Sequence, residues 1–243
     1  MTMDDAGQPV DLADVVGDLG ERGVRCLMVE GGGRIHTQFL TQGLADELHR
    51  LRPGDAVLSE EGLEDPRRFD GGRVWIIDPL DGTREFGEPG RIDWAVHVAL
   101  WADDHFVAGA VALPAIDLTL ATDPAPVVPA AQRDRPRVVT SRTRNPYSTA
   151  VVVHALDAEA VRLGSAGAKA MSVVLGETDI YVHDGGMYQW DSAAPAAVAL
   201  AAGLHVSRID GSPIVYNERD VWLPDLIVCR PEWAQPVLEA LWR

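Results

Sequence analysis

The chain has 243 residues, 47% of them apolar and 24% charged, which is the composition of a globular protein with a sizeable core. Its formal net charge of -16 argues against non-specific binding to nucleic acid. We find no apolar stretch long enough to span a bilayer, no signal-like N-terminus and only two cysteines, so we expect a cytoplasmic protein with no membrane partner.

The first half of the chain predicts short strands and one helix. A strand is expected to end at the glycines of residues 31–33, which lack the spacing of a phosphate-binding fingerprint and are interpreted as a turn. Apolar positions at helical spacing predict a helix over residues 35–50. Residues 114–136, rich in proline, alanine and aspartate, are interpreted as a linker or domain boundary. Apolar runs predict strands over residues 56–58, 74–77, 94–101 and 107–113.

Strand-like and helix-like segments alternate beyond residue 136. We expect strands over residues 137–140, 160–163, 178–183, 204–208 and 225–229. We expect helices over residues 146–156, 167–175 and 192–202, and a final helix from residue 231. This alternation favours an α/β arrangement in layers that follows an α+β first half.

Residues 74–83, Val-Trp-Ile-Ile-Asp-Pro-Leu-Asp-Gly-Thr, form the most informative segment of the sequence. Asp78 and Asp81 end an apolar strand, and buried carboxylates are costly unless a cation neutralises them. Pro79 prevents the strand from continuing, and the resulting bend allows both carboxylates to converge on one point. Oxygen ligands of this kind suit Mg²⁺, while a helix that starts after Asp81 offers N–H groups to a phosphate. Without a metal, the same residues are a turn acid and a helix N-cap.

Further acidic residues precede or follow predicted elements. Glu60 and Glu61 follow a short strand, and such a pair is usually a solvated loop unless it lies beside Asp78 in space. Asp191 precedes an alanine-rich segment, where an aspartate is also a favoured N-cap that needs no metal. Each of these acids therefore has an interpretation without a metal.

Lys169, the only lysine of the chain, follows a turn of small residues at 164–168. Such a turn allows a ligand to approach the backbone closely. A cation at the start of a helix opposes the helix dipole, which is unusual unless an anion offsets it. The alternative is a solvated lysine beside a tightly packed turn.

Four motifs, taken together, resemble the inositol monophosphatase superfamily of Mg²⁺-dependent, lithium-sensitive phosphatases. The resemblance runs from about Arg52 to the C-terminus and rests on residues 59–61, 75–83, 164–167 and 190–194. It implies a layered αβαβα sugar-phosphatase fold with a metal-binding α+β half over residues 51–136 and an α/β half over residues 137–243. Within the superfamily, Thr83-Arg84-Glu85-Phe86 is similar to the CysQ-type branch, the 3′(2′),5′-bisphosphate nucleotidases.

That branch implies an activity in sulfur assimilation and nucleotide recycling. It removes the 3′-phosphate of 3′-phosphoadenosine 5′-phosphate, and in some cases of its sulfated form, to give AMP and phosphate. The alternative on the same fold is hydrolysis of inositol monophosphate or of a sugar phosphate. A homodimer is a further expectation, because dimers are common in the superfamily.

The resemblance also implies a role for each motif residue. Two or three Mg²⁺ ions would be held by Glu60, Asp78, Asp81, Asp191 and the Leu80 carbonyl. Thr83 would position the attacking water beside Asp81, the two acting as the catalytic pair. The scissile phosphate would lie on Gly82 and Thr83, and the rest of the substrate on Ser165, Gly167 and Lys169.

One residue of the superfamily pattern is missing. Its members carry an aspartate on their second helix that works with the motif threonine to activate water. An ungapped count back from Glu60 reaches Thr37, which cannot accept a proton at neutral pH as a carboxylate does. Asp46 and Glu47 lie about two helical turns further on and would need a different register. A low-activity remnant is therefore another hypothesis.

Residues 24–49 resemble a different family, the C-terminal reductase domain of riboflavin biosynthesis proteins. That family uses NADPH, but only a fragment is present, too short to form the fold or to bind the cofactor. We therefore interpret residues 1–50 as an atypical N-terminal segment and do not expect a reductase.

Overall fold

The structure is a computed structural model that describes residues 43–131, 134–144 and 146–242. Its first element is a helix over residues 43–51, which is the end of the helix predicted from residue 35. The predicted glycine turn at residues 31–33 and Thr37 lie outside the described residues. Within the described part of the chain, no helix is long and apolar enough to cross a bilayer.

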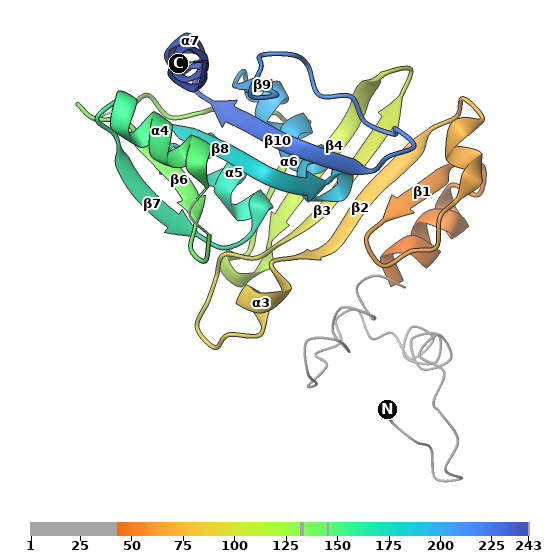
Figure 1. The fold of residues 1–243 in the computed structure, drawn as a ribbon. Helices are drawn as coiled ribbons and strands as arrows, with labels where there is room; N and C mark the ends of the chain where they lie inside the picture. The colour runs from red at the N-terminus through yellow and green to blue at the C-terminus, as the bar shows by residue number, and fades with distance from the viewer. Residues whose placement is uncertain (1–42, 132–133, 145, 243) are drawn as a thin grey trace.

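The first half builds a five-stranded sheet of order β1-β2-β3-β4-β5 (Figure 1). Only β1 and β2 pair in parallel. Short 3-10 turns, η1 (Pro66–Phe69) and η2 (Pro114–Ile116), and a four-residue helix, α3 (Thr83–Phe86), connect the strands. The strands are β1 (Ala56–Ser59), β2 (Val74–Asp81), β3 (Ala95–Ala102), β4 (His105–Leu113) and β5 (Leu118–Ala121).

Strand β5 corrects the sequence-based interpretation of residues 114–136 as a linker. It pairs with β4, with Leu118 opposite Leu113 and Leu120 opposite Val111. Leu118 and Leu120 are both half-buried and pack on the core, whereas Thr119 between them is exposed. The alternation of apolar and polar residues over four positions is a weak strand signal inside a proline-rich stretch. The segment forms a strand because it pairs with β4.

The second half builds another five-stranded sheet of order β7-β6-β8-β10-β9. β6 is parallel to β7 and β8, and β10 is antiparallel to β8 and β9. Each predicted strand is present, and β8 extends five residues further than predicted, because it pairs with β10 as far as Tyr188. The strands are β6 (Arg137–Ser141), β7 (Glu159–Leu163), β8 (Ile180–Tyr188), β9 (His205–Ser207) and β10 (Trp222–Cys229).

Helices alternate with the sheets to give a layered molecule. α5 (Ala166–Val174) and α6 (Gln189–Ala201) contact strands of both sheets and lie between them. α4 (Tyr147–Ala155) and α7 (Pro231–Leu241) cover the other face of the second sheet. Of these two inner helices, α6 is rich in alanine, whose small side chain allows the helix to approach the first sheet closely. The layered α/β fold expected from the sequence is thereby confirmed.

Candidate active site

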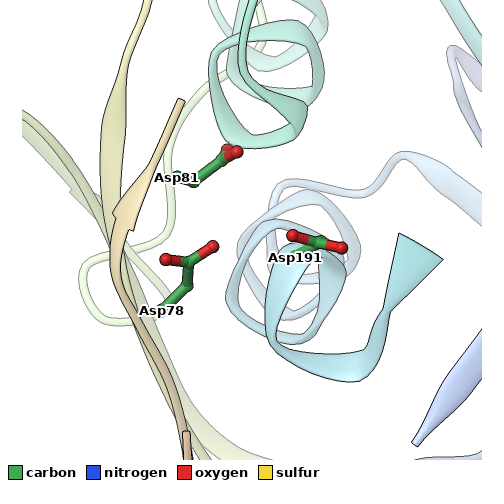
Figure 2. Close-up of side chains that lie close together, drawn as sticks. All are labelled: Asp78, Asp81 and Asp191. Atoms are coloured by element: carbon green, nitrogen blue, oxygen red, sulfur yellow. The ribbon is translucent and has the colours of Figure 1, made fainter. Parts of the chain in front are cut away.

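Asp78 and Asp81 lie at the end of β2, where the strand bends. Asp78 is paired with His97 on β3, after which the register shifts and Asp81 lies opposite Ala95. The Asp78 carboxylate accepts a hydrogen bond from the backbone N–H of Leu80 at 3.0 Å, which fixes the turn around Pro79. Both carboxylates are buried and lie on the same side of the strand (Figure 2).

Asp191 completes a cluster of three carboxylates. It lies in the first turn of α6, and its carboxylate accepts a hydrogen bond from the Tyr188 backbone N–H at 2.6 Å. One oxygen from each of Asp78, Asp81 and Asp191 lies within 4.8 Å of the other two (Figure 2). The structure therefore brings together three predicted metal ligands from two elements that are distant in sequence.

Neither Asp81 nor Asp191 is the N-cap predicted for the helix that follows it, although Asp191 accepts the Tyr188 N–H in a capping box. The N-cap of α6 is Tyr188, so Asp191 is the third residue of the helix. The N-cap of α3 is Gly82. Asp81 binds the start of a different helix, α5, where its two oxygens accept hydrogen bonds from Ala166 N–H at 3.2 Å and Gly167 N–H at 2.6 Å.

The electrostatics of the cluster favour the binding of a cation. Burial raises the pKa of Asp78 well above its usual value, and Asp81 and Glu60 raise it further. Burial, followed by the charge of Asp81, raises the pKa of Asp191 to about 7. Burial also acts on Asp81, but His97 and the Gly167 N–H outweigh it and hold the pKa of Asp81 below its usual value. Hard carboxylate oxygens at this spacing, short of positive charge, fit a divalent cation such as Mg²⁺.

Glu60 lies at the edge of this cluster, at the end of β1. Burial raises its pKa, the neighbouring Glu61 raises it further, and a hydrogen bond with Asp78 opposes both. The contact with Asp78 is the condition under which the sequence predicted a metal-binding role for Glu60. Glu60 is nevertheless an exposed residue, and it is not one of the three mutually close acids.

The turn after Asp81 is tightly packed. Gly82 has φ +88°, and a Cβ at this position would lie 2.9 Å from the Cβ of Ser165, so only glycine fits without strain. Thr83, the first residue of α3, donates a hydrogen bond from its hydroxyl to the Leu80 carbonyl at 3.2 Å. The Thr83 hydroxyl and the Leu80 carbonyl thus lie side by side at the end of β2.

The loop before α5 supports the cluster from the other side. Ser165 is the N-cap of α5, and its side chain accepts a hydrogen bond from Ala168 N–H at 2.8 Å. The Lys169 ammonium donates to the carbonyls of Ser165, at 2.8 Å, and of Gly164. Lys169 is buried, and burial lowers its pKa to about 8 although nearby acids raise it. The alternative of a solvated lysine is therefore wrong.

A pocket of about 460 Å³ opens beside these residues. Asp81, Thr83 and Asp191 line it, as do Ser165 and Lys169, whereas Gly167 does not. The lining also includes four residues that were not predicted from the sequence. They are the exposed cations Arg84 and Arg144, and the aromatic residues Tyr188 and Trp222, whose ring centroids are 5.5 Å apart.

Glu85 provides a physical reason for the Thr-Arg-Glu-Phe sequence. It is buried, and its side chain fills the space that a Cβ at Gly164 would occupy. Arg142, just after β6, donates to Glu85 and Glu88, both at 2.5 Å. α3 is thereby fixed to the second sheet, next to the pocket.

His97 is the main site residue that sequence analysis missed, because the sequence shows no metal-ligand spacing among the histidines. It is fully buried behind the cluster, with Nε2 3.3 Å from the Asp81 carboxylate. Burial lowers its pKa, but Asp81 and Asp78 outweigh this and raise the pKa to about 9. His97 is therefore a nearby positive charge for the acidic cluster.

Asp46 and Glu47 do not approach the cluster as alternatives to the missing aspartate. Both are exposed on the helix at residues 43–51. The Glu47 carboxylate is paired with Arg50, with Arg50 Nε 2.8 Å from Glu47 Oε2. Thr37 lies outside the described residues.

Solved structures share this fold. The inositol monophosphatase II of Staphylococcus aureus is similar with a TM-score of 0.73 at 18% identity, over 93% of this chain and 87% of that chain. CysQ from Bacteroides thetaiotaomicron is similar with a TM-score of 0.65 at 25% identity, over 78% and 82%. The fold is therefore that of the inositol monophosphatases.

The family model confirms this class. Residues 36–243 match the inositol monophosphatase family, and the chain belongs to that family, whose members depend on metal ions. The match begins earlier than Arg52, where the sequence motifs first showed the resemblance. A second model, the RibD C-terminal domain, matches residues 3–51, in agreement with the reductase-like fragment and overlapping the start of the phosphatase match.

Two proteins that are similar in sequence indicate which members of the family this chain resembles. The chain is 48% identical to the 3′-phosphoadenosine 5′-phosphate phosphatase of Mycobacterium bovis over 225 residues, which is 88% of this chain and 83% of the relative. It is 28% identical to the 3′(2′),5′-bisphosphate nucleotidase CysQ of Escherichia coli K12, over 74% of this chain and 77% of the relative.

Proposed function

We propose that this protein is a Mg²⁺-dependent phosphatase that removes the 3′-phosphate of 3′-phosphoadenosine 5′-phosphate and releases AMP and phosphate. The observation that carries the proposal is the carboxylate cluster at the edge of a pocket that also contains three basic side chains. The 48% identity to a phosphatase of this name supports the same substrate.

The acidic residues are proposed to hold the metal. Asp78, Asp81 and Asp191 are mutually close, Glu60 contacts Asp78, and the Leu80 carbonyl lies beside the Thr83 hydroxyl. These donors would accommodate two or three Mg²⁺ ions. When bound, such ions lower the pKa of a water molecule and stabilise the charge of the transferring phosphoryl group.

The protein's own groups are proposed to orient the substrate. Thr83 would align the attacking water with its hydroxyl, which the Leu80 carbonyl holds in place, while the backbone of Gly82 and Thr83 contacts the scissile phosphate. Ser165 and Lys169 line the pocket, which supports their predicted contact with the rest of the substrate. Gly167 does not line it, and its N–H is bound to Asp81, so we assign it a supporting position instead.

The pocket composition favours a bisphosphate nucleotide over inositol phosphate. A substrate with two phosphates needs positive charge away from the metal site, and Arg84, Arg144 and Lys169 supply it in an otherwise acidic protein. Tyr188 and Trp222 are 44% and 45% exposed at the same pocket, so flat apolar surface is accessible to a base. Inositol phosphate has one phosphate and no flat ring.

Phosphate release by the purified full-length chain tests the proposal. With 3′-phosphoadenosine 5′-phosphate as substrate, we expect turnover in Mg²⁺ that disappears in EDTA and returns when Mg²⁺ is added in excess. Turnover at the rate of the uncatalysed reaction in Mg²⁺, by protein with a native circular dichroism spectrum, would contradict it and favour the low-activity remnant. The cytoplasmic location and the homodimer stay predictions.

A further inference from the structure

His97 connects two elements that carry acids of the site. Its ring, on β3, is fully buried and does not line the pocket. Nδ1 lies 3.1 Å from the carbonyl oxygen of Trp190, and Nε2 lies 3.3 Å from Oδ2 of Asp81. Trp190 immediately precedes Asp191, so a single rigid ring touches both Asp81 and the first turn of the helix that carries Asp191.

In the hydrogen bond between His97 and Trp190, only the histidine can be the donor. A carbonyl oxygen only accepts, so Nδ1 carries the hydrogen and donates it to Trp190. The other nitrogen, Nε2, lies 3.3 Å from the Asp81 carboxylate and makes no hydrogen bond within the described residues. Each ring nitrogen thus faces an element that carries an acid of the cluster. His97 is not among the residues that line the pocket.

The surrounding backbone makes room for this ring. A Cβ at Gly167 would collide with Nε2 of His97, so the ring fits only because residue 167 is glycine. The Gly167 N–H donates at 2.6 Å to Oδ2 of Asp81, the same oxygen that His97 approaches. His97 and Gly167 therefore hold one oxygen of Asp81 between them, and Ala166 N–H holds the other.

We propose that His97 is a positioning residue that sets the location of Asp81 relative to Asp191 and so determines how tightly the carboxylate cluster binds its metal. The inference rests on the proposed function in that it takes the cluster to be the metal site. His97 does not contact substrate in this role. Groups of this kind behind a metal ligand typically change metal affinity by about 10- to 100-fold when replaced.

Mn²⁺ binding measured by electron paramagnetic resonance tests this without substrate. Free Mn²⁺ gives a sharp signal that is lost on binding, so the method reports affinity independently of turnover. We expect His97→Leu, which removes both contacts, to weaken Mn²⁺ binding by about 10- to 100-fold. We expect His97→Asn, whose amide keeps one of the two contacts, to weaken it less. His205→Asn is the matched control, because His205 bonds Ser207 in β9, outside the cluster, and it should bind as the wild type does.

The outcomes separate the two proposals. If the wild type itself does not bind Mn²⁺, the proposed metal site is wrong. If it binds and both His97 variants bind within twofold of it, the positioning role is wrong while the phosphatase proposal stands. Should His97→Leu fail to fold, as judged by thermal melting, His97→Asn decides: a loss of affinity with an unchanged melting temperature supports the role, and unchanged affinity overturns it.

Discussion

The Oδ2 atom of Asp81 accepts the backbone N–H of Gly167 at 2.6 Å, and this bond joins the end of β2 to the start of α5. It places a carboxylate at the N-terminus of a helix from the other half of the chain, where the helix dipole favours negative charge. His97 and this bond together hold the pKa of Asp81 below its usual value, while Asp78 and Asp191 have raised pKa values. The cluster thus combines one carboxyl group whose pKa is lowered with two whose pKa values are raised.

Replacing Asp81 by asparagine should abolish Mg²⁺-dependent phosphate release. Asparagine keeps an oxygen that accepts the Gly167 N–H, so the fold should survive, but the anionic ligand is lost. We expect a fall of at least about 100-fold in kcat, since metal-assisted water activation depends on this charge. Asp157→Asn, a change in an acid that is 87% exposed, is the control and should leave the rate unchanged. Undiminished turnover by Asp81→Asn would remove this carboxylate from the site.

Gly167→Ala should disturb both stability and metal binding. The added methyl group meets the buried His97 ring, and overpacking of this kind typically lowers the free energy of unfolding by about 1–3 kcal/mol. Urea unfolding measures the first effect and Mn²⁺ titration the second. Gly43→Ala is a matched control, because no atom of the described residues lies within 4 Å of the added Cβ. Equal unfolding curves for Gly167→Ala and wild type would contradict the close approach.

Removing either pocket arginine should affect a bisphosphate more than a monophosphate. For Arg84→Gln and Arg144→Gln we expect KM for 3′-phosphoadenosine 5′-phosphate to rise about tenfold, the size of one hydrogen bond to a charged group. KM for inositol 1-phosphate, which lacks a second phosphate, should change little. Arg135→Gln, in an exposed pair with Asp157, serves as the control. Equal increases for both substrates would mean that these arginines do not contact the second phosphate.

Stability of the metal-free protein should fall as the pH rises through neutrality. The folded-state pKa of Asp191 is raised to about 7, above its unfolded value, so its contribution is fully present below the unfolded pKa and is lost as pH passes the folded one. Asp78 acts in the same direction. We therefore expect the melting temperature in EDTA to decrease between pH 6 and pH 8. Saturating Mg²⁺ should raise it and flatten the dependence, because bound cations favour the ionised acids.

The same melting curves contain a control. In Asp191→Asn the charge that titrates near neutrality is absent, so its melting temperature in EDTA should depend less on pH than that of the wild type. A wild-type curve that is flat or rises from pH 6 to pH 8 would mean that these carboxylates are not forced together in the folded protein.

The sequence predicted those parts of the molecule that local patterns determine. The start of β2 and the alternation beyond residue 136 were recognised because apolar periodicity acts over a few residues. Pro79 was expected to stop the strand, but β2 continues to Asp81 across a register shift in its pairing with β3. β5 was missed because its alternation is short and its partner, β4, defines it. The carboxylate cluster was predicted from the combination of motifs. Asp81 and Asp191 are separated by 110 positions, so no local sequence signal places them together.

Side chains whose role depends on tertiary contacts could not be predicted from local sequence patterns. His97 is an ordinary strand residue until β3 pairs with β2 and Gly167 leaves space for its ring. For Lys169 the sequence left a solvated side chain open as the alternative to a substrate contact, because its burial depends on the loop that its ammonium binds. Arg144 has no motif, and only the folded pocket brings it near Thr83. In each case the information lies in tertiary packing.

The most direct test of the account is the ratio of kcat/KM for 3′-phosphoadenosine 5′-phosphate to that for inositol 1-phosphate, measured with the full chain in saturating Mg²⁺. A pocket with three cations and two accessible aromatic rings beside the carboxylate cluster predicts a ratio far above one, with both activities lost in EDTA. A ratio near or below one, with Mg²⁺-dependent turnover intact, would show that the site hydrolyses monophosphates generally and would contradict the nucleotide assignment.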